Sequence, residues 1–279
     1  MCFVFNIFGN SQSVLFEISI NILCKGMSIV MEFYANEGKK SGVEVNGKKY
    51  MRHSIKTHFV KQGEDYIEVF KKYVSPIYQE GDIVSTSEKI IALCQNRVIK
   101  REELKIGFWA KLLSKFASHP DTGYGVGETI KMQYAIHEAG LPKVLWASFA
   151  SAVTKLFGKK GVFYEIVGTE VSGLDGFYDK VWDEYGDIGI KIPENPNGVC
   201  NELKEKLGMS CIIVDANDLG QELLGCSDDL RSSIPEEELI KFVKDNPSGQ
   251  GKELTPIILI RPVENFEKNG DTLAPGVEA

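Results

Sequence analysis

The sequence has no excess of basic residues. Its 279 residues include 39 acidic and 32 basic side chains, which gives a formal net charge of −7 and a pI near 5.3. A protein that grips nucleic acid through phosphates needs basic groups to displace counterions, so we expect no nucleic-acid partner. An anionic nucleotide remains compatible with this balance, because a local pocket with a divalent metal can hold phosphates. The hydrophobic content of 43% and the mean hydropathy of −0.13 are typical of a globular protein.

Paired cysteines and the common catalytic motifs are also missing. The six cysteines show no CxxC pair and no ligand-type spacing to a histidine, so we expect neither a zinc site nor a disulfide framework, and a cytoplasmic protein. There is no GxSxG or HExxH motif. The glycines of 123–127 do not make a dinucleotide fingerprint, because Glu128 stands in place of the third glycine. The loop 246–252 is not a P-loop, because Asn246 replaces its first glycine.

The N-terminal segment lacks an apolar run long enough to cross a membrane. Residues 1–33 are apolar but interrupted by polar side chains such as Asn6 and Glu17, and the first lysine is Lys25. A signal peptide needs a basic start and a membrane span needs about 18 uninterrupted apolar residues. We interpret residues 1–47 as an extension, either a mis-called start or a disordered segment, and expect no membrane partner. The main folded region is predicted at 48–264 and a polar tail at 265–279.

Alternating helical and strand patterns predict an α+β fold with mixed sheets. Apolar residues at helical spacing follow an N-terminal turn at 63–65, and Gly140 and Gly208 stand where helices commonly end. A capping box at Ser233–Glu236 predicts another helix start, and Pro247 its end. The expected helices are 66–74, 128–139, 152–156, 199–207 and 236–243, and the expected strands are 81–87, 144–149, 162–167, 188–192, 211–214 and 255–260.

Three loops hold the candidate site residues. After the strand 211–214, the loop carries Asp215, Asn217 and Asp218, whose oxygen atoms suit a hard divalent cation or the capping of a turn. In the second loop, Asp175 lies between glycines, which permit close approach to a ligand or form a tight turn. Backbone N–H groups of the third loop, 246–252, can cradle an anion. Both interpretations of each loop stay open on these patterns alone.

Five segments in a fixed order carry a resemblance to a known family. They read GDIVSTSEKII with RV shortly after (81–91 and 97–98), GLDG (173–176), IKIPENP (190–196), IIVDANDLG (212–220) and NPSGQ running into TPIILIR (246–261). In this order they resemble the coenzyme F-420-0:γ-glutamyl ligases, GTP-dependent enzymes that add L-glutamate to a deazaflavin coenzyme. The resemblance covers about residues 57–261.

The resemblance implies a two-part α+β fold, an intertwined homodimer, GTP as co-substrate and two Mg²⁺ or Mn²⁺ ions. It implies no catalytic nucleophile, because GTP converts the acceptor carboxylate to an acyl phosphate that the amine of glutamate attacks. The implied metal ligands are Asp175, Asp215 or Asp218, and Gln250. The implied nucleotide-binding residues are Thr57, His58, Phe59, Val60, Glu88, Lys89, Ser248, Gly249, Gln250 and Gly251.

Two departures from the family pattern keep other functions open. Ala216 stands where the family has Thr or Ser, and Leu93 stands where it has a basic residue. The stretch 124–163 is typical of a divergent subgroup. The first hypothesis is therefore a glutamate ligase acting on the F-420-0 precursor. The second is the same chemistry on another acceptor, such as a folate, and the third is a nucleotide- and metal-binding module without ligase activity.

Overall fold

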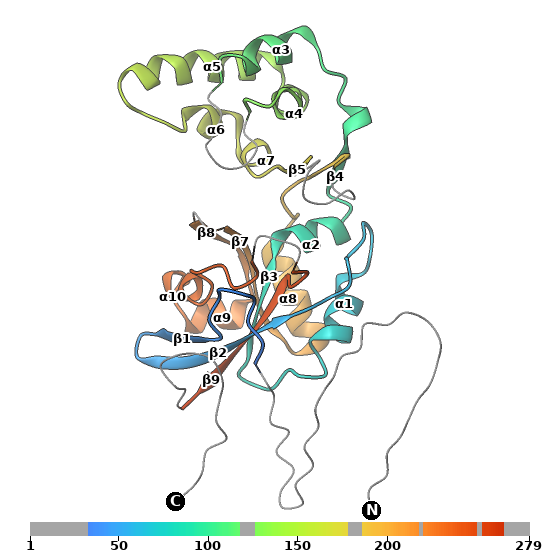
Figure 1. The fold of residues 1–279 in the computed structure, drawn as a ribbon, viewed down its shortest axis with the longest axis vertical. Helices are drawn as coiled ribbons and strands as arrows, with labels where there is room; N and C mark the ends of the chain where they lie inside the picture. Colours follow the sequence, from blue (N-terminus) through green and yellow to red (C-terminus); the bar gives the residue numbers. More distant parts are fainter. Residues whose placement is uncertain (1–32, 118–125, 178–185, 218–219, 250–252, 265–279) are drawn as a thin grey trace, which may run out of the picture. The chain divides into compact units, whose positions relative to one another are not determined.

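A mixed six-stranded sheet forms the larger of two sheets in the computed structural model, which describes residues 33–117, 126–177, 186–217, 220–249 and 253–264. Its strand order is β1-β2-β9-β3-β7-β8 (Figure 1). Only β3 and β7 pair in parallel, and the other neighbours are antiparallel. The strands are β1 (Gly42–Val45), β2 (Lys48–Ile55), β3 (Ile83–Ser87), β7 (Ser210–Asn217), β8 (Gly220–Cys226) and β9 (Ile257–Val263).

The core of this sheet consists of the apolar runs of β7 and β9. Ile212 and Ile260 are fully buried, and such continuous apolar strands are typical of sheets covered on both faces. Phe242 and Leu239 pack into the same cluster, and α8 contacts both β7 and β8. The helices of this region are α1 (Tyr66–Tyr73), α2 (Glu88–Cys94), α8 (Pro196–Leu207), α9 (Asp228–Ser233) and α10 (Glu236–Lys241).

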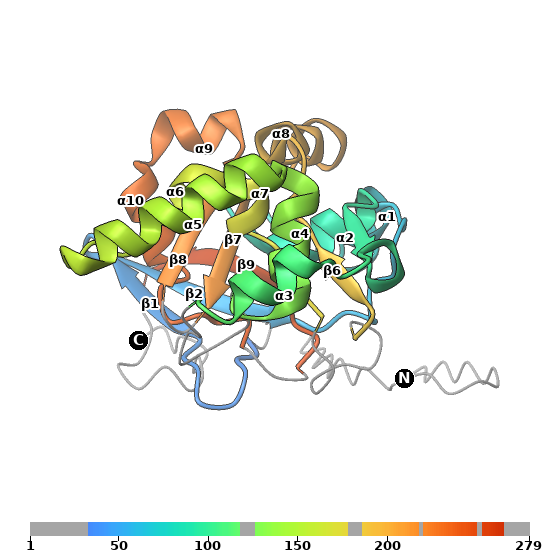
Figure 2. The same cartoon turned by 90° about the horizontal axis from the view of Figure 1, so that it is seen from above.

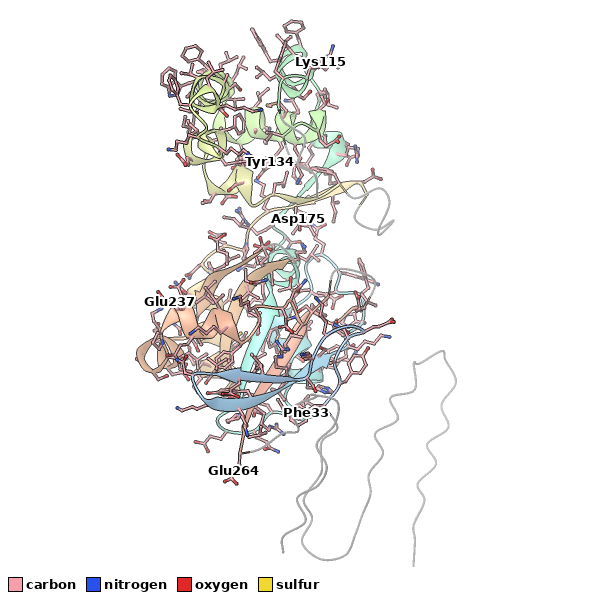
Figure 3. All side chains as sticks on the ribbon, turned by 60° about the vertical axis from the view of Figure 1, so that its left-hand side comes forward. Phe33, Lys115, Tyr134, Asp175, Glu237 and Glu264 are labelled. Atoms are coloured by element: carbon pink, nitrogen blue, oxygen red, sulfur yellow. The ribbon has the colours of Figure 1, made fainter. Side chains whose placement is uncertain are left out.

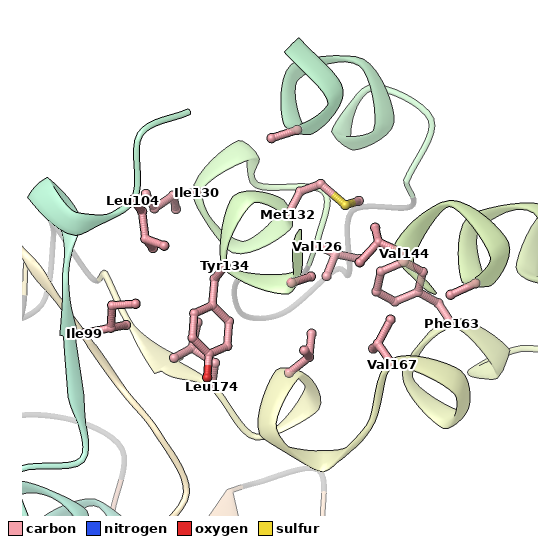
Figure 4. Packing of buried hydrophobic residues seen from close by; sticks show 14 of the residues in the cluster. Ile99, Leu104, Val126, Ile130, Met132, Tyr134, Val144, Phe163, Val167 and Leu174 are labelled. Atoms are coloured by element: carbon pink, nitrogen blue, oxygen red, sulfur yellow. The ribbon is translucent and has the colours of Figure 1, made fainter. Parts of the chain in front are cut away.

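A second, three-stranded antiparallel sheet leads into a helical lobe. Its order is β4 (Val98–Lys100), β6 (Ile188–Ile190) and β5 (Asp175–Gly176). Tyr134, Met132 and Val144 belong to the buried core of the lobe (Figure 4). Its helices are η1 (Arg101–Glu103), α3 (Phe108–Ser114), α4 (Thr129–Ala139), α5 (Leu141–Leu156), α6 (Val162–Val167) and α7 (Thr169–Ser172). The α+β class with a mixed sheet is confirmed, while the smaller sheet is antiparallel throughout.

Two predicted strands, 144–149 and 162–167, are wrong: both segments are helical. Residues 144–149 lie inside α5, whose buried positions Val144 and Ala147 are three residues apart, which is the spacing of a helix and not of a strand. Pro142 lies in the first turn of α5, a position that favours helix initiation. The apolar run at 162–167 follows Gly161, which has φ of 87° and is the N-cap of α6.

Two further predictions are wrong: the helix start at the capping box Ser233–Glu236, and the end of the strand at Val214. The hydroxyl of Ser233 donates to the carbonyl oxygens of Asp229 and Leu230, so it belongs to the end of α9, and α10 follows Pro235 without a side-chain cap. Strand β7 continues to Asn217 and pairs with β8, a hairpin that was not expected. Asp215 is therefore a strand residue and not a loop residue.

The remaining expected elements are confirmed within a few residues of their ends. They are the helices at 66–74, 128–139, 199–207 and 236–243 and the strands at 81–87, 188–192 and 255–260. The helix expected at 152–156 is only the C-terminal end of α5, which begins at Leu141. Residues 33–47, which the sequence placed in the extension, contribute β1 to the sheet. The rest of the extension and the tail 265–279 lie outside the described residues. No helix in the described part of the chain is long and apolar enough to cross a membrane.

A buried ion pair joins β9 to the start of β3. The guanidinium of Arg261 donates from Nε to Oδ1 of Asp82 at 2.8 Å and from Nη2 to Oδ2 at 2.6 Å. Asp82 is only 1% exposed, and it also accepts the backbone N–H of Gln79. Removing one partner of such a pair leaves the other charge buried and uncompensated.

We expect Asp82→Ala to lower the free energy of unfolding by about 3 kcal/mol, because Arg261 would lose its buried counter-charge. Urea denaturation followed by circular dichroism measures this change. The matched control is Glu237→Ala, on the exposed side of α10, which should change stability by no more than about 0.5 kcal/mol. Equal effects of the two substitutions would show that the ion pair contributes no more than a surface charge.

Candidate functional site

Two candidate residues meet because β3 and β7 run in parallel. Ser87 lies opposite Val214 in this register, so the next residues, Glu88 and Asp215, lie at the same edge of the sheet. Ser87 also caps α2, since its hydroxyl accepts the backbone N–H of Lys89. The carboxyl ends of adjacent parallel strands are a common place for ligands in α/β sheets. The sheet topology thus brings together residues that are 127 positions apart in the chain.

The predicted nucleotide segments reach the same edge through β9. Ile55 and Thr86 both lie opposite Ile257, the first residue of β9. The chain just before β9 is bonded to both neighbours, because Thr57 N–H donates to Leu254 O and Ser87 N–H donates to Pro256 O, each at 2.9 Å. The segments that contain Thr57, Ser87 and Leu254–Pro256 are therefore neighbours in space.

The carboxylates at this edge repel one another. Glu88 is 5% exposed. Burial is the largest cause that raises the pKa of Glu88 to about 8, and the nearby negative charge of Asp215 is the second. Asp215 pairs directly with Glu222 across the β7–β8 hairpin, an arrangement of like charges that destabilises a sheet. Burial raises the pKa of Asp215; the charge of Lys89 opposes this rise, while those of Asp175 and Glu222 add to it.

Two lysines approach the acidic group from different elements. Nζ of Lys89 lies 2.6 Å from Oδ2 of Asp175. Burial opposes the charged form of Lys89, but the carboxylate of Asp175 outweighs it and raises the pKa of Lys89. Lys131 of α4 is buried and donates to Leu174 O at 2.9 Å, and burial lowers the pKa of Lys131. The site therefore contains both signs of charge.

Asp175, which is labelled in Figure 3, is positioned by close packing of β5 against β6. Gly176 has φ of 98°, and a Cβ atom there would lie 2.5 Å from Ile188 O. At Gly173 a Cβ atom would lie 2.3 Å from the side chain of Ile192. The glycines of this segment thus allow the chain to approach its own neighbouring strand, whereas the sequence had left open an approach to a ligand or a tight turn. Asp175 is held at a defined place as a consequence.

The loop before β9 contains backbone conformations that are uncommon for residues other than glycine. Asn246 has φ of 50° and Leu254 has φ of 53°, in the left-handed region. Asn36 secures the loop from outside, since its amide donates to Pro247 O at 2.8 Å and to the Thr255 hydroxyl at 2.7 Å. Strained backbone of this kind persists where the surroundings enforce it and is common at ligand sites.

Several predicted residues have other partners or lie outside the described residues. The ring nitrogens of His58 lie 2.8 Å from the Tyr73 hydroxyl and 2.7 Å from Glu64 Oε2. The hydroxyl of Thr57 donates to His58 O, and Val60 is buried while Phe59 is half-buried. Ser248 and Gly249 are in the loop before β9, and Ser248 O accepts the Thr255 hydroxyl. Asp218, Gln250 and Gly251 lie outside the described residues.

Glu222 and Lys131 were missed by the sequence analysis. Glu222 carries no signal unless the hairpin is recognised, because its place beside Asp215 depends on the β7–β8 register. Lys131 stands between Ile130 and Met132 near the start of α4, and all three are buried. A lysine among the buried positions of a helix is uncommon without a partner. The position of Lys131 between two apolar residues was therefore the feature of the sequence that could have identified it.

The donor chemistry fits a divalent cation, although the described residues do not complete a ligand set. Carboxylate oxygens are the donors that Mg²⁺ and Mn²⁺ prefer, and carboxylates with raised pKa values would gain from a nearby positive charge. The described part of the chain contains no group of three or more His, Cys, Asp or Glu side chains arranged to hold a metal ion. Of the four predicted ligands, Asp175 and Asp215 lie in the described part of the chain, whereas Asp218 and Gln250 do not.

No protein-family model matches this chain, and no curated protein sequence matches it. The resemblance to the γ-glutamyl ligases therefore depends on the five sequence segments and on their order. The geometry of the sheet edge is an independent observation, because it was derived from strand register and hydrogen bonds.

We expect Glu88→Gln to stabilise the protein at alkaline pH. The pKa of Glu88 is about 8 in the folded protein against an ordinary value of 4.5, so the folded state binds the proton more tightly. Stability contributed by this group is present below pH 4.5 and is lost as the pH rises to about 8. One unit of pKa corresponds to about 1.4 kcal/mol, so the gain from Gln above pH 8 should reach a few kcal/mol.

Urea denaturation at pH 5 and pH 9, in the presence of a metal chelator, measures this difference. The control is Glu205→Gln on the exposed side of α8, which should show the same small effect at both pH values. A gain from Glu88→Gln that is independent of pH would contradict the raised pKa of Glu88.

Proposed function

We propose that this protein is a GTP- and divalent-metal-dependent ligase that forms an amide between L-glutamate and an acceptor carboxylate of the coenzyme F-420-0 type. The observation that supports the proposal is the meeting of four segments at one edge of the sheet. Glu88 and Lys89, Asp175, Asp215 and the loop before β9 come from distant parts of the chain. These are the segments to which the resemblance assigns the metal and the nucleotide.

The charges at this edge suit phosphoryl transfer. An oxygen of the acceptor carboxylate attacks the γ-phosphorus of GTP and GDP leaves, so the protein is asked mainly to position the groups and to offset negative charge. Lys89 supplies a fixed positive charge, and Asp175 holds its ammonium group in place. Divalent ions, when bound, would neutralise phosphate charge, and Asp175 and Asp215 with Asp218 and Gln250 are the residues proposed to hold them.

Amide formation completes the proposed reaction. The amino group of L-glutamate attacks the acyl carbon and gives up a proton to solvent, the C–O bond to phosphate breaks, and inorganic phosphate leaves. No side chain of the protein forms a covalent bond in these steps, which agrees with the absence of nucleophile motifs from the sequence. The same steps apply to a different acceptor carboxylate, such as that of a folate, because the nucleotide and metal groups are independent of the acceptor.

One observation favours a second candidate, a nucleotide- and metal-binding module without ligase activity. Lys89 occupies one oxygen of Asp175 at 2.6 Å, and this ion pair has to open or rearrange before Asp175 binds a cation through that oxygen. Ala216 and Leu93 depart from the family pattern in the same region. The two candidates differ in turnover and not in binding.

We expect GTP together with Mg²⁺ or Mn²⁺ to raise the melting temperature, whereas ATP or either metal alone should have less effect. A ligand at about 100 times its dissociation constant stabilises by about 2.7 kcal/mol, which corresponds to a shift of about 5 °C or more for a chain of this size. Asp215→Asn should abolish most of this shift because it removes a predicted ligand. The control, Glu205→Gln, should retain it.

Phosphate release then separates the two candidates. A ligase releases phosphate from GTP only when both glutamate and an acceptor carboxylate are present, and mass spectrometry detects the added glutamate. Metal-dependent stabilisation without turnover on any acceptor would favour the binding module. The ligase site would be rejected if Asp175→Ala and Asp215→Ala left metal-dependent nucleotide turnover intact, or if no metal and nucleotide combination changed the melting temperature.

A further inference from the structure

Helix α5 exposes its large apolar side chains and buries its small ones. Its buried residues are only Val144 and Ala147. Trp146, Phe149 and Leu156 are exposed, Leu156 by 85%. A helix on the surface of a water-soluble domain ordinarily places its large apolar residues toward the core, so the orientation of α5 is reversed with respect to this rule.

Helix α3 and the residues just after it also expose large apolar side chains. Phe108 is 70% exposed and Phe116 is 81% exposed. The rings of Phe108 and Trp109 are 5.5 Å apart and those of Trp146 and Phe149 are 5.9 Å apart. In Figure 2 both α3 and α5 are turned toward the viewer. We call this set the aromatic face: Phe108, Trp109, Phe116, Trp146, Phe149, Val153, Leu156 and Phe157.

The sequence segment that carries the aromatic face is positively charged, in contrast to the chain as a whole. Residues 105–160 contain eight lysines and three acidic residues, while the chain carries a net charge of −7. Neither α3 nor α5 contains an acidic residue. Every lysine of 105–160 except Lys131 is exposed. Large apolar side chains exposed on neighbouring turns of a helix mark interaction sites, and the positive charge indicates an anionic partner.

A second copy of the chain is a poorer partner than an anionic surface. In a two-fold dimer the same patch faces itself, so the lysines near α3 and α5 would face lysines. Exposed Trp and Phe rings together with lysines are instead the residues that enter the interface of a lipid bilayer. Lysines near such a surface are attracted by anionic lipid head groups.

We infer that the aromatic face binds the surface of an anionic phospholipid bilayer, with α3 and α5 lying in the plane of the interface. The lack of a long apolar run near the N-terminus led us to expect no membrane partner, but that argument concerns a spanning segment and not binding to a membrane surface. This inference is independent of the proposed ligase site, because no residue of the aromatic face belongs to the acidic edge of the sheet.

Flotation of the full-length protein with vesicles tests the inference. The protein should float with phosphatidylcholine vesicles that contain about 30% phosphatidylserine and bind at least tenfold less to phosphatidylcholine alone, because anionic lipid attracts the lysines. Raising the salt to about 0.5 M should weaken binding. The fluorescence of Trp109 and Trp146 should shift to shorter wavelength with the anionic vesicles.

A triple variant identifies the binding surface. Phe149→Ser with Leu156→Ser and Phe157→Ser should weaken vesicle binding at least tenfold, because three side chains no longer enter the interface. All three positions are exposed, so the circular dichroism spectrum and melting temperature should be unchanged. Tyr34→Ser is the matched control, because Tyr34 is an exposed aromatic residue outside the aromatic face, and it should bind as the unmodified protein does.

Three outcomes would overturn the inference. The first is no flotation with either vesicle. The second is unchanged binding by the triple variant, which would assign lipid binding to another part of the chain. The third is self-association in light scattering that the triple variant abolishes, without vesicle binding by either protein, which would show that the aromatic face joins two copies.

Discussion

Negative charge is held together at one edge of the six-stranded sheet against its own repulsion. The parallel register of β3 and β7 places Glu88 beside Asp215, and the β7–β8 hairpin places Glu222 opposite Asp215. These side chains would separate if the strands were free to do so. The backbone hydrogen bonds of the sheet and the buried apolar residues of β7 and β9 prevent it, so the electrostatics of the edge depend on the core beneath it.

The helical lobe supplies the complementary part of this arrangement. Tyr134 and Leu174 belong to its core, and Lys131 of α4 holds the carbonyl oxygen of Leu174. Asp175 follows Leu174 directly and pairs with Lys89. Packing within the lobe thus determines where one carboxylate of the site lies. Lys89 of α2 and Asp175 of β5 bring opposite charges together at this point. A ligand that contacts both side chains would therefore contact both elements.

The class of fold and the helices α1, α4, α8 and α10 follow from patterns in the sequence. The wrong predictions have identifiable causes. The apolar runs at 144–149 and 162–167 contain valine and aromatic residues that favour strands, yet in α5 the residues that face the core are the small Val144 and Ala147. Short apolar runs do not distinguish a strand from a helix by periodicity alone. The aromatic face was missed for a related reason. Apolar residues at helical spacing do not show which side of the helix packs against the core.

Patterns in the sequence were enough to establish the charge of the chain, the absence of the common catalytic motifs, and Asp175 and Asp215 as candidate ligands, because these depend on composition and on neighbouring residues only. Glu88 and Lys89 were named only by the resemblance, which depends on the order of five segments. Tertiary structure alone decided that these residues meet, that Glu222 joins them, and that the pKa of Glu88 rises to about 8. Strand register and burial are set by contacts between distant parts of the chain, and no local pattern contains them.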